Sequence, residues 1–355
     1  MRITTPLLVS LALAFCTLKL SAQTFTEISA DLGMAYSYDD WNYIGGGVAF
    51  FDYDNDGDED FYFTGGKNPD QLYRNDGDGS FTNVSEGIGL EVTGTYYTAG
   101  VTTGDIDNDG YREIYVTTYG FNNDFGSIRR DLLFRNNGDG TFTEIGALAN
   151  ISSAARSVSA TFLDHDQDGF LDIYVVNYVE ETRVTTDEDG KVNGFDHDCY
   201  ENFFYHNNGN LTFTPAAVEL NVAGTGCGLA VTNLDFEGDG DTDIYAINDF
   251  GQFIVPNQML LNNSSTGTFD RPETDTINDI HIGLYGMGIA WGDYDLDLDY
   301  DYYVSNIDDN ALLNNDGNLF FTDVATAVGV QNDRTVNDLL VTSWGNAFAD
   351  VNNDL

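Results

Sequence analysis

The sequence is poor in basic residues. It contains 13 Lys and Arg against 59 Asp and Glu among 355 residues, so its formal net charge is −46. A surface this negative repels phosphate backbones and anionic lipid headgroups, which argues against nucleic acids and membrane surfaces as partners. Proline is also scarce, with five residues, whereas glycine reaches 38. This balance is typical of tight turns between strands and not of a proline-rich linker array.

Long apolar runs are missing after the first residues. Arg2 gives a positive start, residues 7–18 are nearly all apolar or small, and Ala22 ends the stretch with a small side chain. This is the pattern of a secretory signal peptide. A transmembrane anchor would need about 20 uninterrupted apolar residues, and Pro6 and Lys19 interrupt this stretch. We therefore predict a signal peptide over residues 1–22, no direct membrane insertion, and a secreted or cell-surface protein formed by residues 23–355.

Cysteine is rare, and one of the three residues, Cys16, lies in the signal segment. Cys199 and Cys227 remain in the mature chain. A cysteine pair in an exported protein favours a disulfide over a metal or redox site, and no CxxC or Cys/His metal spacing is present. We predict that Cys199 and Cys227 form a disulfide; two unrelated buried thiols are the alternative.

One acidic segment of nine residues recurs along the chain. Its general form is Asp-x-Asp-x-Asp-Gly-x-x-Asp, and successive complete copies start 53, 59, 71 and 58 residues apart. Periods of this size indicate a solenoid, propeller or array. The five complete copies span residues 52–60, 105–113, 164–172, 235–243 and 293–301, and a sixth, begun at Asp350, is cut off by the end of the sequence.

Each acidic segment lies between two strand-like stretches. An apolar, glycine-punctuated stretch precedes it, as at residues 47–51, and an aromatic and β-branched run follows it, as at 114–116. Two further strands are joined by Asn-Gly or Asp-Gly turns, which accept the positive φ of a hairpin. Four antiparallel strands per repeat form a propeller blade. We predict an all-β propeller with five complete four-stranded blades and part of a sixth.

The segment after the signal peptide is similar to the end of a repeat. Phe25-Thr-Glu-Ile28 matches Phe142-Thr-Glu-Ile145 of a later copy. In a closed ring, such an N-terminal strand completes the last blade and removes a sheet edge. The three strands that it would complete are not in the sequence, so we expect the sequence to be part of a longer protein.

The spacing of the carboxylates predicts a cation site in each loop. Side chains at positions 1, 3, 5 and 9 and the backbone carbonyl at position 7 can converge on one point, and glycine at position 6 allows a sharp turn. Hard oxygen ligands in this number favour Ca²⁺. An EF-hand is excluded because the glutamate at position 12 is missing, whereas acidic surface turns without metal are the alternative. The predicted ligands of about five structural Ca²⁺ ions are Asp52, Asp54, Asp56, Asp58 and Asp60; Asp105, Asp107, Asp109, Tyr111 and Glu113; Asp164, Asp166, Asp168, Phe170 and Asp172; Asp235, Glu237, Asp239, Asp241 and Asp243; and Asp293, Asp295, Asp297, Asp299 and Asp301, with Asp350, Asn352 and Asp354 starting a sixth set.

The five sites are not expected to be equal. Glu113 and Glu237 replace aspartate with a longer side chain. Leu298 replaces the glycine at position 6, where a bulky residue at positive φ is costly. We therefore expect the fifth site to be the weakest or to use a different loop conformation.

The acidic loops, the glycine-punctuated strands before them and turns such as Asn136-Asn-Gly-Asp-Gly-Thr-Phe-Thr143 resemble the FG-GAP/VCBS repeats of integrin α-subunits. Residues 24–355 are most similar to the exported ASPIC/UnbV (cartilage-acidic-protein-like) branch. The resemblance implies a seven-bladed, calcium-binding propeller that serves adhesion or ligand recognition, with a further C-terminal domain common in the family.

Three function classes stay open. The first is an extracellular recognition or adhesion propeller with a protein or glycan ligand. The second is a glycan-active lyase or hydrolase that uses inserted loops at residues 179–202 and 249–258, and the third is a structural module of a larger surface protein. No GxSxG, HExxH or P-loop motif is present, and we assign no catalytic residue and no oligomeric state.

The four histidines do not favour an enzyme. His165, at loop position 2, is expected to point away from the metal, and His206 stands where sister repeats have Arg74 and Arg135. His197 belongs to the inserted loop of the longest repeat, where a structural role is favoured over catalysis, and His281 has no visible partner.

Overall fold

A computed structural model describes most of the chain. The described residues are 26–34, 36–39, 45–120, 130–151, 154–272, 279–317, 319–332 and 342–349. The predicted signal peptide (1–22) and the sixth loop with Asp350, Asn352 and Asp354 lie outside the described residues. Among the residues described, no helix is long and apolar enough to cross a bilayer.

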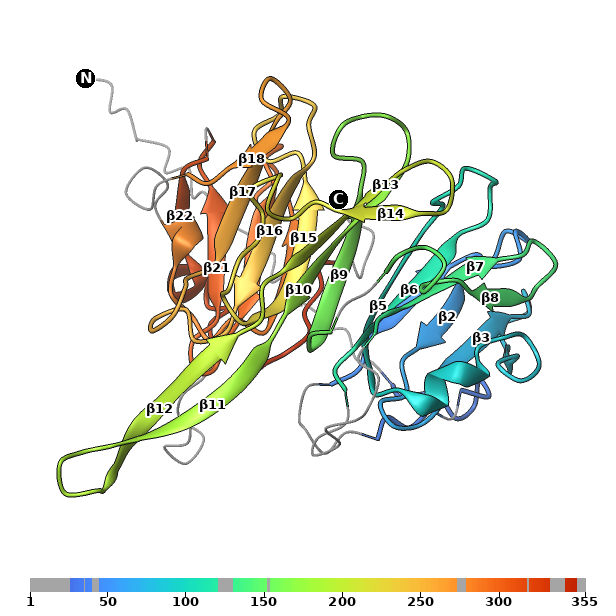
Figure 1. Cartoon of the computed structure of the whole chain (residues 1–355), viewed down its shortest axis with the longest axis horizontal. Helices are drawn as coiled ribbons and strands as arrows, with labels where there is room; N and C mark the ends of the chain where they lie inside the picture. The colour runs from blue at the N-terminus through green and yellow to red at the C-terminus, as the bar shows by residue number, and fades with distance from the viewer. Residues whose placement is uncertain are drawn as a thin grey trace, which may run out of the picture.

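The structure is all-β and built from four-stranded antiparallel sheets, as predicted (Figure 1). Five such sheets follow one another along the chain, and each is a blade of a propeller-like fold. Blade one comprises β1 (Val48–Phe51), β2 (Asp60–Phe63), β3 (Gln71–Asn75) and β4 (Phe81–Asn83); blade two β5 (Thr98–Gly104), β6 (Glu113–Thr118), β7 (Leu132–Asn136) and β8 (Phe142–Glu144); blade three β9 (Ser157–Leu163), β10 (Asp172–Asn177), β13 (Phe203–Asn207) and β14 (Phe213–Pro215); blade four β15 (Gly228–Leu234), β16 (Asp243–Asn248), β17 (Gln258–Asn263) and β18 (Thr268–Asp270); and blade five β19 (Gly288–Gly292), β20 (Asp301–Ser305), β21 (Ala311–Asn315) and β22 (Phe321–Asp323).

Three short helical segments accompany the blades: η1 (Glu91–Thr95), η2 (Asp279–His281) and α1 (Ala325–Val328). None of them covers a sheet as a layer, since each has five residues or fewer.

The first strands of the blades surround a common cavity. It measures about 260 Å³ and is lined by residues 45–47, Val158, Leu229, Met287 and Trp344 among others. Hydroxyl groups at the ends of the second strands β2 and β6 join neighbouring blades. Thr64 Oγ1 donates to the Ala99 carbonyl at 2.7 Å and Thr117 Oγ1 to the Val158 carbonyl at 2.9 Å. The inner strands therefore line the axis of the propeller.

The core lies between adjacent blades. Successive side chains of a strand point to opposite faces of its sheet, so Ile114 and Val116 pack against blade one whereas Tyr115 packs against blade three. The same alternation on β10 sends Tyr174 toward blade four and Ile173 toward blade two. Each inner blade is thus covered on both faces, which explains why every residue of the second strands β6 and β10 is buried.

Residues 28–34 pack against blade one in the way that the last residues of each repeat pack against the next blade. The Leu32 carbonyl accepts from the Phe81 backbone N–H at 3.1 Å. In the following blades the corresponding bonds run from Phe142 to Ile88 and from Phe213 to Ala149. The N-terminal segment therefore behaves as part of a preceding repeat, as its sequence predicts; its pairing with a last blade stays a prediction.

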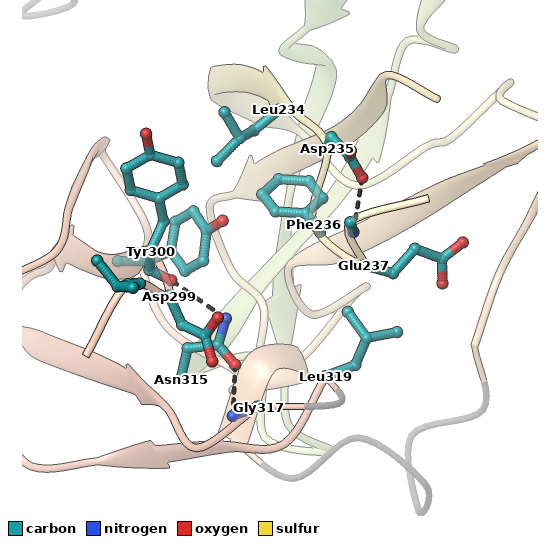
Figure 2. Close-up of a pocket in the computed structure, with 12 residues that line it drawn as sticks. Leu234, Asp235, Phe236, Glu237, Asp299, Tyr300, Asn315, Gly317 and Leu319 are labelled. Carbon is teal, nitrogen blue, oxygen red and sulfur yellow. Dashed lines mark hydrogen bonds between the residues drawn. The ribbon is translucent and has the colours of Figure 1, made fainter. Parts of the chain in front are cut away.

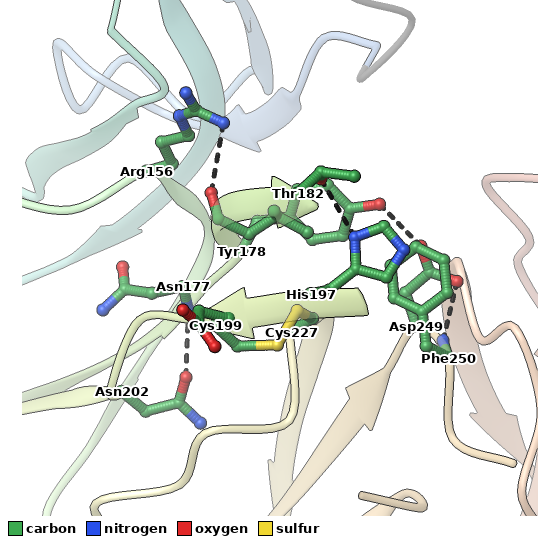
Figure 3. The surroundings of a disulfide bond; sticks show 12 residues. Arg156, Asn177, Tyr178, Thr182, His197, Cys199, Asn202, Cys227, Asp249 and Phe250 are labelled. Atoms are coloured by element: carbon green, nitrogen blue, oxygen red, sulfur yellow. Dashed lines mark hydrogen bonds between the residues drawn. A yellow bond between two sulfur atoms is a disulfide. The ribbon is translucent and has the colours of Figure 1, made fainter. Parts of the chain in front are cut away.

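The insertion in the third repeat is a long hairpin. β11 (Val179–Thr186) pairs with β12 (Val192–Cys199), and the pair projects away from the blades (Figure 1). At its base Cys199 is bonded to Cys227, with a Cα–Cα distance of 5.0 Å, which confirms the predicted disulfide (Figure 3). The ring of His197 stacks on Phe250 at a centroid distance of 4.2 Å. The disulfide and this stack fasten the hairpin to blade four.

Candidate metal centres

The five acidic loops share one backbone structure. In loop one, the carboxylate of Asp52 at position 1 accepts from the N–H groups of Asp56 and Gly57 at 3.0 and 2.8 Å. Asp56 at position 5 accepts in turn from the N–H of Asp58 at position 7. The same three bonds recur in loops two to five. The loop is therefore held in shape by its own carboxylates.

The carboxylate at position 9 is buried in every loop. Asp60 is fully buried and accepts from the N–H of Tyr53 at 3.0 Å and from that of Asn75 at 2.8 Å. Equivalent pairs of bonds reach the other four carboxylates. Burial raises the pKa of Asp60 and Asp301 to about 6, that of Asp243 to about 7 and that of Glu113 to about 8. A bound cation would offset this cost of burying a negative charge.

Carboxylate oxygens converge in four of the five loops. Positions 1, 3 and 9 of loops one and two, and positions 1, 3 and 5 of loops three and five, each place three ligand atoms within 4.8 Å of one another. Oδ1 of Asp54 and of Asp107, both at position 3, is buried without a hydrogen-bond partner. Arg135 occupies the other oxygen of Asp107, at 2.9 Å. Unpartnered buried oxygens within an all-oxygen donor set fit a hard cation such as Ca²⁺.

Loop four departs from this arrangement. Among the described residues its carboxylates form no trio of that kind. Glu237 stands at position 3 in place of aspartate, and its longer side chain lies along the wall of a pocket (Figure 2). Glutamate at position 3 of loop four therefore coincides with the loss of the trio, whereas Glu113 at position 9 of loop two still belongs to one.

The fifth loop keeps the conformation of the others. Leu298 has φ of 80°, close to the 97° of Gly57 at the same position, and its N–H donates to Asp293 as that of Gly57 donates to Asp52. The expectation of a different loop conformation is thus wrong: the leucine adopts the glycine geometry, with a side chain that is 89% exposed. The expectation that this site is the weakest stays a prediction.

Position 4 was not singled out from the sequence, yet it also has positive φ in all five loops. The amide of Asn55 donates to the Gly110 carbonyl at 2.9 Å, and that of Asn108 to the Gly169 carbonyl at 2.8 Å. Gln167 continues the series, with a bond of 3.0 Å to the Gly240 carbonyl. The side chain at position 4 of one loop therefore binds position 6 of the next, which links loops one to four.

The link between loops four and five is missing because Gly238 occupies position 4. A pocket of about 450 Å³ lies there, lined by both loops (Figure 2). Gly238, Phe236 and Glu237 contribute from blade four, and Asp299 and Tyr300 from blade five. Asn315 donates to the Tyr300 carbonyl of its own loop, whereas its equivalent in blade four, Asn262, reaches across to the His165 carbonyl of blade three. We call this opening the seam pocket.

Aromatic side chains flank the seam pocket. Trp291 and Tyr300 pack edge to face at a centroid distance of 4.8 Å, and both are about two-fifths exposed. The pocket thus combines carboxylates, a phenol and apolar surface, a set that suits hydrogen-bonded recognition of a polar ligand.

His165 does not point away from the ligands, contrary to expectation. Its Nδ1 lies 2.5 Å from Oδ2 of Asp172, and His206 Nδ1 lies 3.1 Å from Oδ1 of the same carboxylate. Burial lowers the pKa of His165, but the hydrogen bond and charge of Asp172 outweigh that effect and raise it overall. His197 hydrogen-bonds Thr182 and stacks on Phe250, in line with the expected structural role.

Comparison with known families finds a match for part of the chain. Residues 24–116 and 122–175 match the family described as FG-GAP-like repeat. These two stretches are therefore similar to FG-GAP-like repeats. The matched residues hold the first three acidic loops, at 52–60, 105–113 and 164–172. A comparison with curated proteins found no match.

Several solved structures are distantly similar to this chain. An Agrocybe aegerita lectin, described as recognising non-reducing terminal N-acetylglucosamine, has 18% identity and a TM-score of 0.46 over 79% of this chain and 65% of its own. The V. cholerae biofilm matrix protein Bap1 has 14% identity and a TM-score of 0.31, over 68% of this chain and 40% of its own. A GH43 β-1,3-galactosidase with galactodeoxynojirimycin has 10% identity and a TM-score of 0.36, over 79% and 92%. The chain therefore spans less than two thirds of the lectin and of Bap1.

Proposed function

We propose that this protein is an exported, calcium-binding β-propeller of the ASPIC/UnbV type that recognises an extracellular ligand. The observation that carries the proposal is the repeated loop. Each copy has a buried carboxylate at position 9, and loops one and two also hold a buried, unpartnered oxygen at position 3. Burying so many carboxylates without a cation is costly. Ca²⁺ at the loops offsets this cost.

Calcium in this proposal is structural. At a free Ca²⁺ concentration ten times Kd, one site stabilises the folded chain by about 1.4 kcal/mol, so five independent sites add about 7 kcal/mol. That sum is comparable to the free energy of unfolding of a whole domain. The position-4 side chains extend the effect, because an ion that fixes one loop also fixes the carbonyl to which the preceding loop is bonded.

The seam pocket is the proposed ligand site. It opens where the loop-to-loop link is lost, and it offers the side chains of Asp299 and Tyr300 to a glycan or to a protein side chain. The scarcity of Lys and Arg, 13 in all, argues against polyanionic ligands. The proposal thus predicts a neutral or cationic ligand.

A screen against glycans and surface proteins, with and without Ca²⁺, tests the proposal. The decisive variant is Gly238→Asn, which restores the side chain present at Asn55 and Asn108 and closes the seam; asparagine tolerates the positive φ of 72° at this position. The control is Asn55→Gly, which removes a link far from the pocket. The proposal predicts binding that Gly238→Asn abolishes and Asn55→Gly preserves. Equal binding by both variants would show that the ligand binds outside the seam pocket. Turnover of a polysaccharide that requires His197 would instead support an enzyme.

A further inference from the structure

Blade three differs from the other blades at two positions that meet at one carboxylate. His165 stands at loop position 2, and His206 lies on β13 directly before Asn207. They are two of the four histidines in the chain. At position 2 the other loops have Tyr53, Ile106, Phe236 and Tyr294, and at the His206 position the other blades have Arg74, Arg135, Leu261 and Asn314.

Both imidazoles contact Asp172, one at each oxygen. His165 Nδ1 lies 2.5 Å from Oδ2, and His206 Nδ1 lies 3.1 Å from Oδ1. The two rings are nearly perpendicular, at 85°, with centroids 5.4 Å apart. Asp166 completes the group, since one ligand atom from each of the four side chains lies within 4.8 Å of the others. The four donor atoms thus lie close enough together to share one ion.

The surroundings hold the two rings in place. The side chain of Asp172 is 1% exposed and that of His165 is 9% exposed, whereas His206 is 30% exposed. His165 packs edge to face on Phe204 at 5.1 Å and lies parallel to Phe269. Asp172 is fixed by the N–H groups of His165 and Asn207, at 3.2 and 2.7 Å. Asp166 and His206 remain open to solvent and leave a path for an ion.

Two nitrogen and two oxygen donors select a different ion from the all-oxygen loops. Neutral imidazole is a good ligand for Zn²⁺ and for other transition-metal ions such as Cu²⁺ and Ni²⁺, whereas Ca²⁺ prefers oxygen ligands. Four side chains converging from one loop and one adjacent strand suit the four-coordinate preference of zinc. We propose that blade three binds one divalent transition-metal ion of the zinc type through His165, Asp166, Asp172 and His206. This inference goes beyond the proposed calcium function, since it assigns loop three to another ion. Each imidazole coordinates the metal as the neutral base, so metal binding releases any proton held between the rings and Asp172.

Zinc titration of the tag-free mature chain tests the proposal. The chain is first stripped with chelator and then saturated with Ca²⁺, so that the oxygen loops do not compete for the probe. Calorimetry is expected to show one Zn²⁺ per chain, and the spectrum of the Cu²⁺-loaded chain in electron paramagnetic resonance should show coupling to two imidazole nitrogens. His206→Arg and His165→Tyr install residues found in sister blades, so the fold is retained while the Zn²⁺ equivalent is lost.

Two further histidines supply matched controls. His197→Gln and His281→Gln lie outside the group and should leave Zn²⁺ binding unchanged. The proposal is overturned if the wild type binds no Zn²⁺ in the presence of Ca²⁺, or if His206→Arg and His165→Tyr both bind it like the wild type. Zinc binding in a chain that binds no Ca²⁺ would contradict the calcium function and leave this inference standing, so the two failures are distinguishable.

Discussion

Replacing Leu298 with glycine should stabilise the protein. Leu298 has φ of 80°, where a residue with a side chain pays about 1–2 kcal/mol relative to right-handed geometry. Glycine removes that strain, but its unfolded chain is more flexible, so folding costs about 0.5–1 kcal/mol more in backbone entropy. Since the leucine side chain is 89% exposed, few contacts are lost. We expect a net gain of about 0.5–1 kcal/mol in the free energy of unfolding.

Chemical denaturation of matched variants measures this gain. Leu298→Ala removes the side chain but keeps the strain, so it should lie within about 0.5 kcal/mol of the wild type. Gly57→Ala is the reciprocal change: a Cβ at Gly57 meets no atom within 4 Å, so only backbone strain at φ of 97° destabilises it. The measurements are made in chelator and again in Ca²⁺. If Leu298→Gly is no more stable than Leu298→Ala, the strain argument is refuted.

Three further predictions concern the scaffold. Mutating Cys199 and Cys227 together to serine opens a loop with a sequence separation of 28 and should cost about 3–4 kcal/mol in the chain-entropy model, measured by denaturation of the oxidised protein. Asp70→Asn should flatten the pH dependence of stability. Burial raises the pKa of Asp70 in the folded protein to about 6, above its unfolded value, so its contribution to stability is fully present below about pH 4 and is lost as the pH rises through 6. Melting temperatures at pH 4 and pH 8 check this, and an unchanged pH slope would contradict it. Asn108→Gly removes the 2.8 Å link to the Gly169 carbonyl without adding strain and should cost about 1 kcal/mol; a denaturation midpoint equal to that of the wild type would show that the link contributes nothing.

The repeat made the blades predictable. Turn residues and aromatic strands recur with a fixed order, so five four-stranded sheets follow from local pattern alone. The hairpin of β11 and β12 was expected as an inserted loop, although β-branched residues on both sides of Asp189-Gly190 were a signal for it. The length of the third repeat indicates an insertion, whereas the β-branched residues on both sides of the Asp-Gly turn indicate that the insertion is a hairpin.

The contacts between loops were beyond reach of the sequence. Asn55 and Gly110 are 55 residues apart, and their bond depends on the positive φ at position 4, which asparagine, glutamine, glycine and leucine all adopt here. Likewise His165 and His206 are separated by 41 positions and meet because β10 and β13 are neighbours in one sheet. The sequence identifies the residue types at each position, but the contacts between distant residues depend on which strands and loops become neighbours in the fold.

Thermal unfolding of the mature chain in Ca²⁺ and in chelator tests the central claim most directly. If the acidic loops hold structural Ca²⁺, the melting temperature falls in chelator and recovers when Ca²⁺ is restored in excess. The loss should be large, because the four loops that remain for Ca²⁺ once loop three is assigned to another ion contribute about 6 kcal/mol at ten times Kd. The same melting temperature in both solutions would contradict the account, since the loops would then be acidic turns that need no ion.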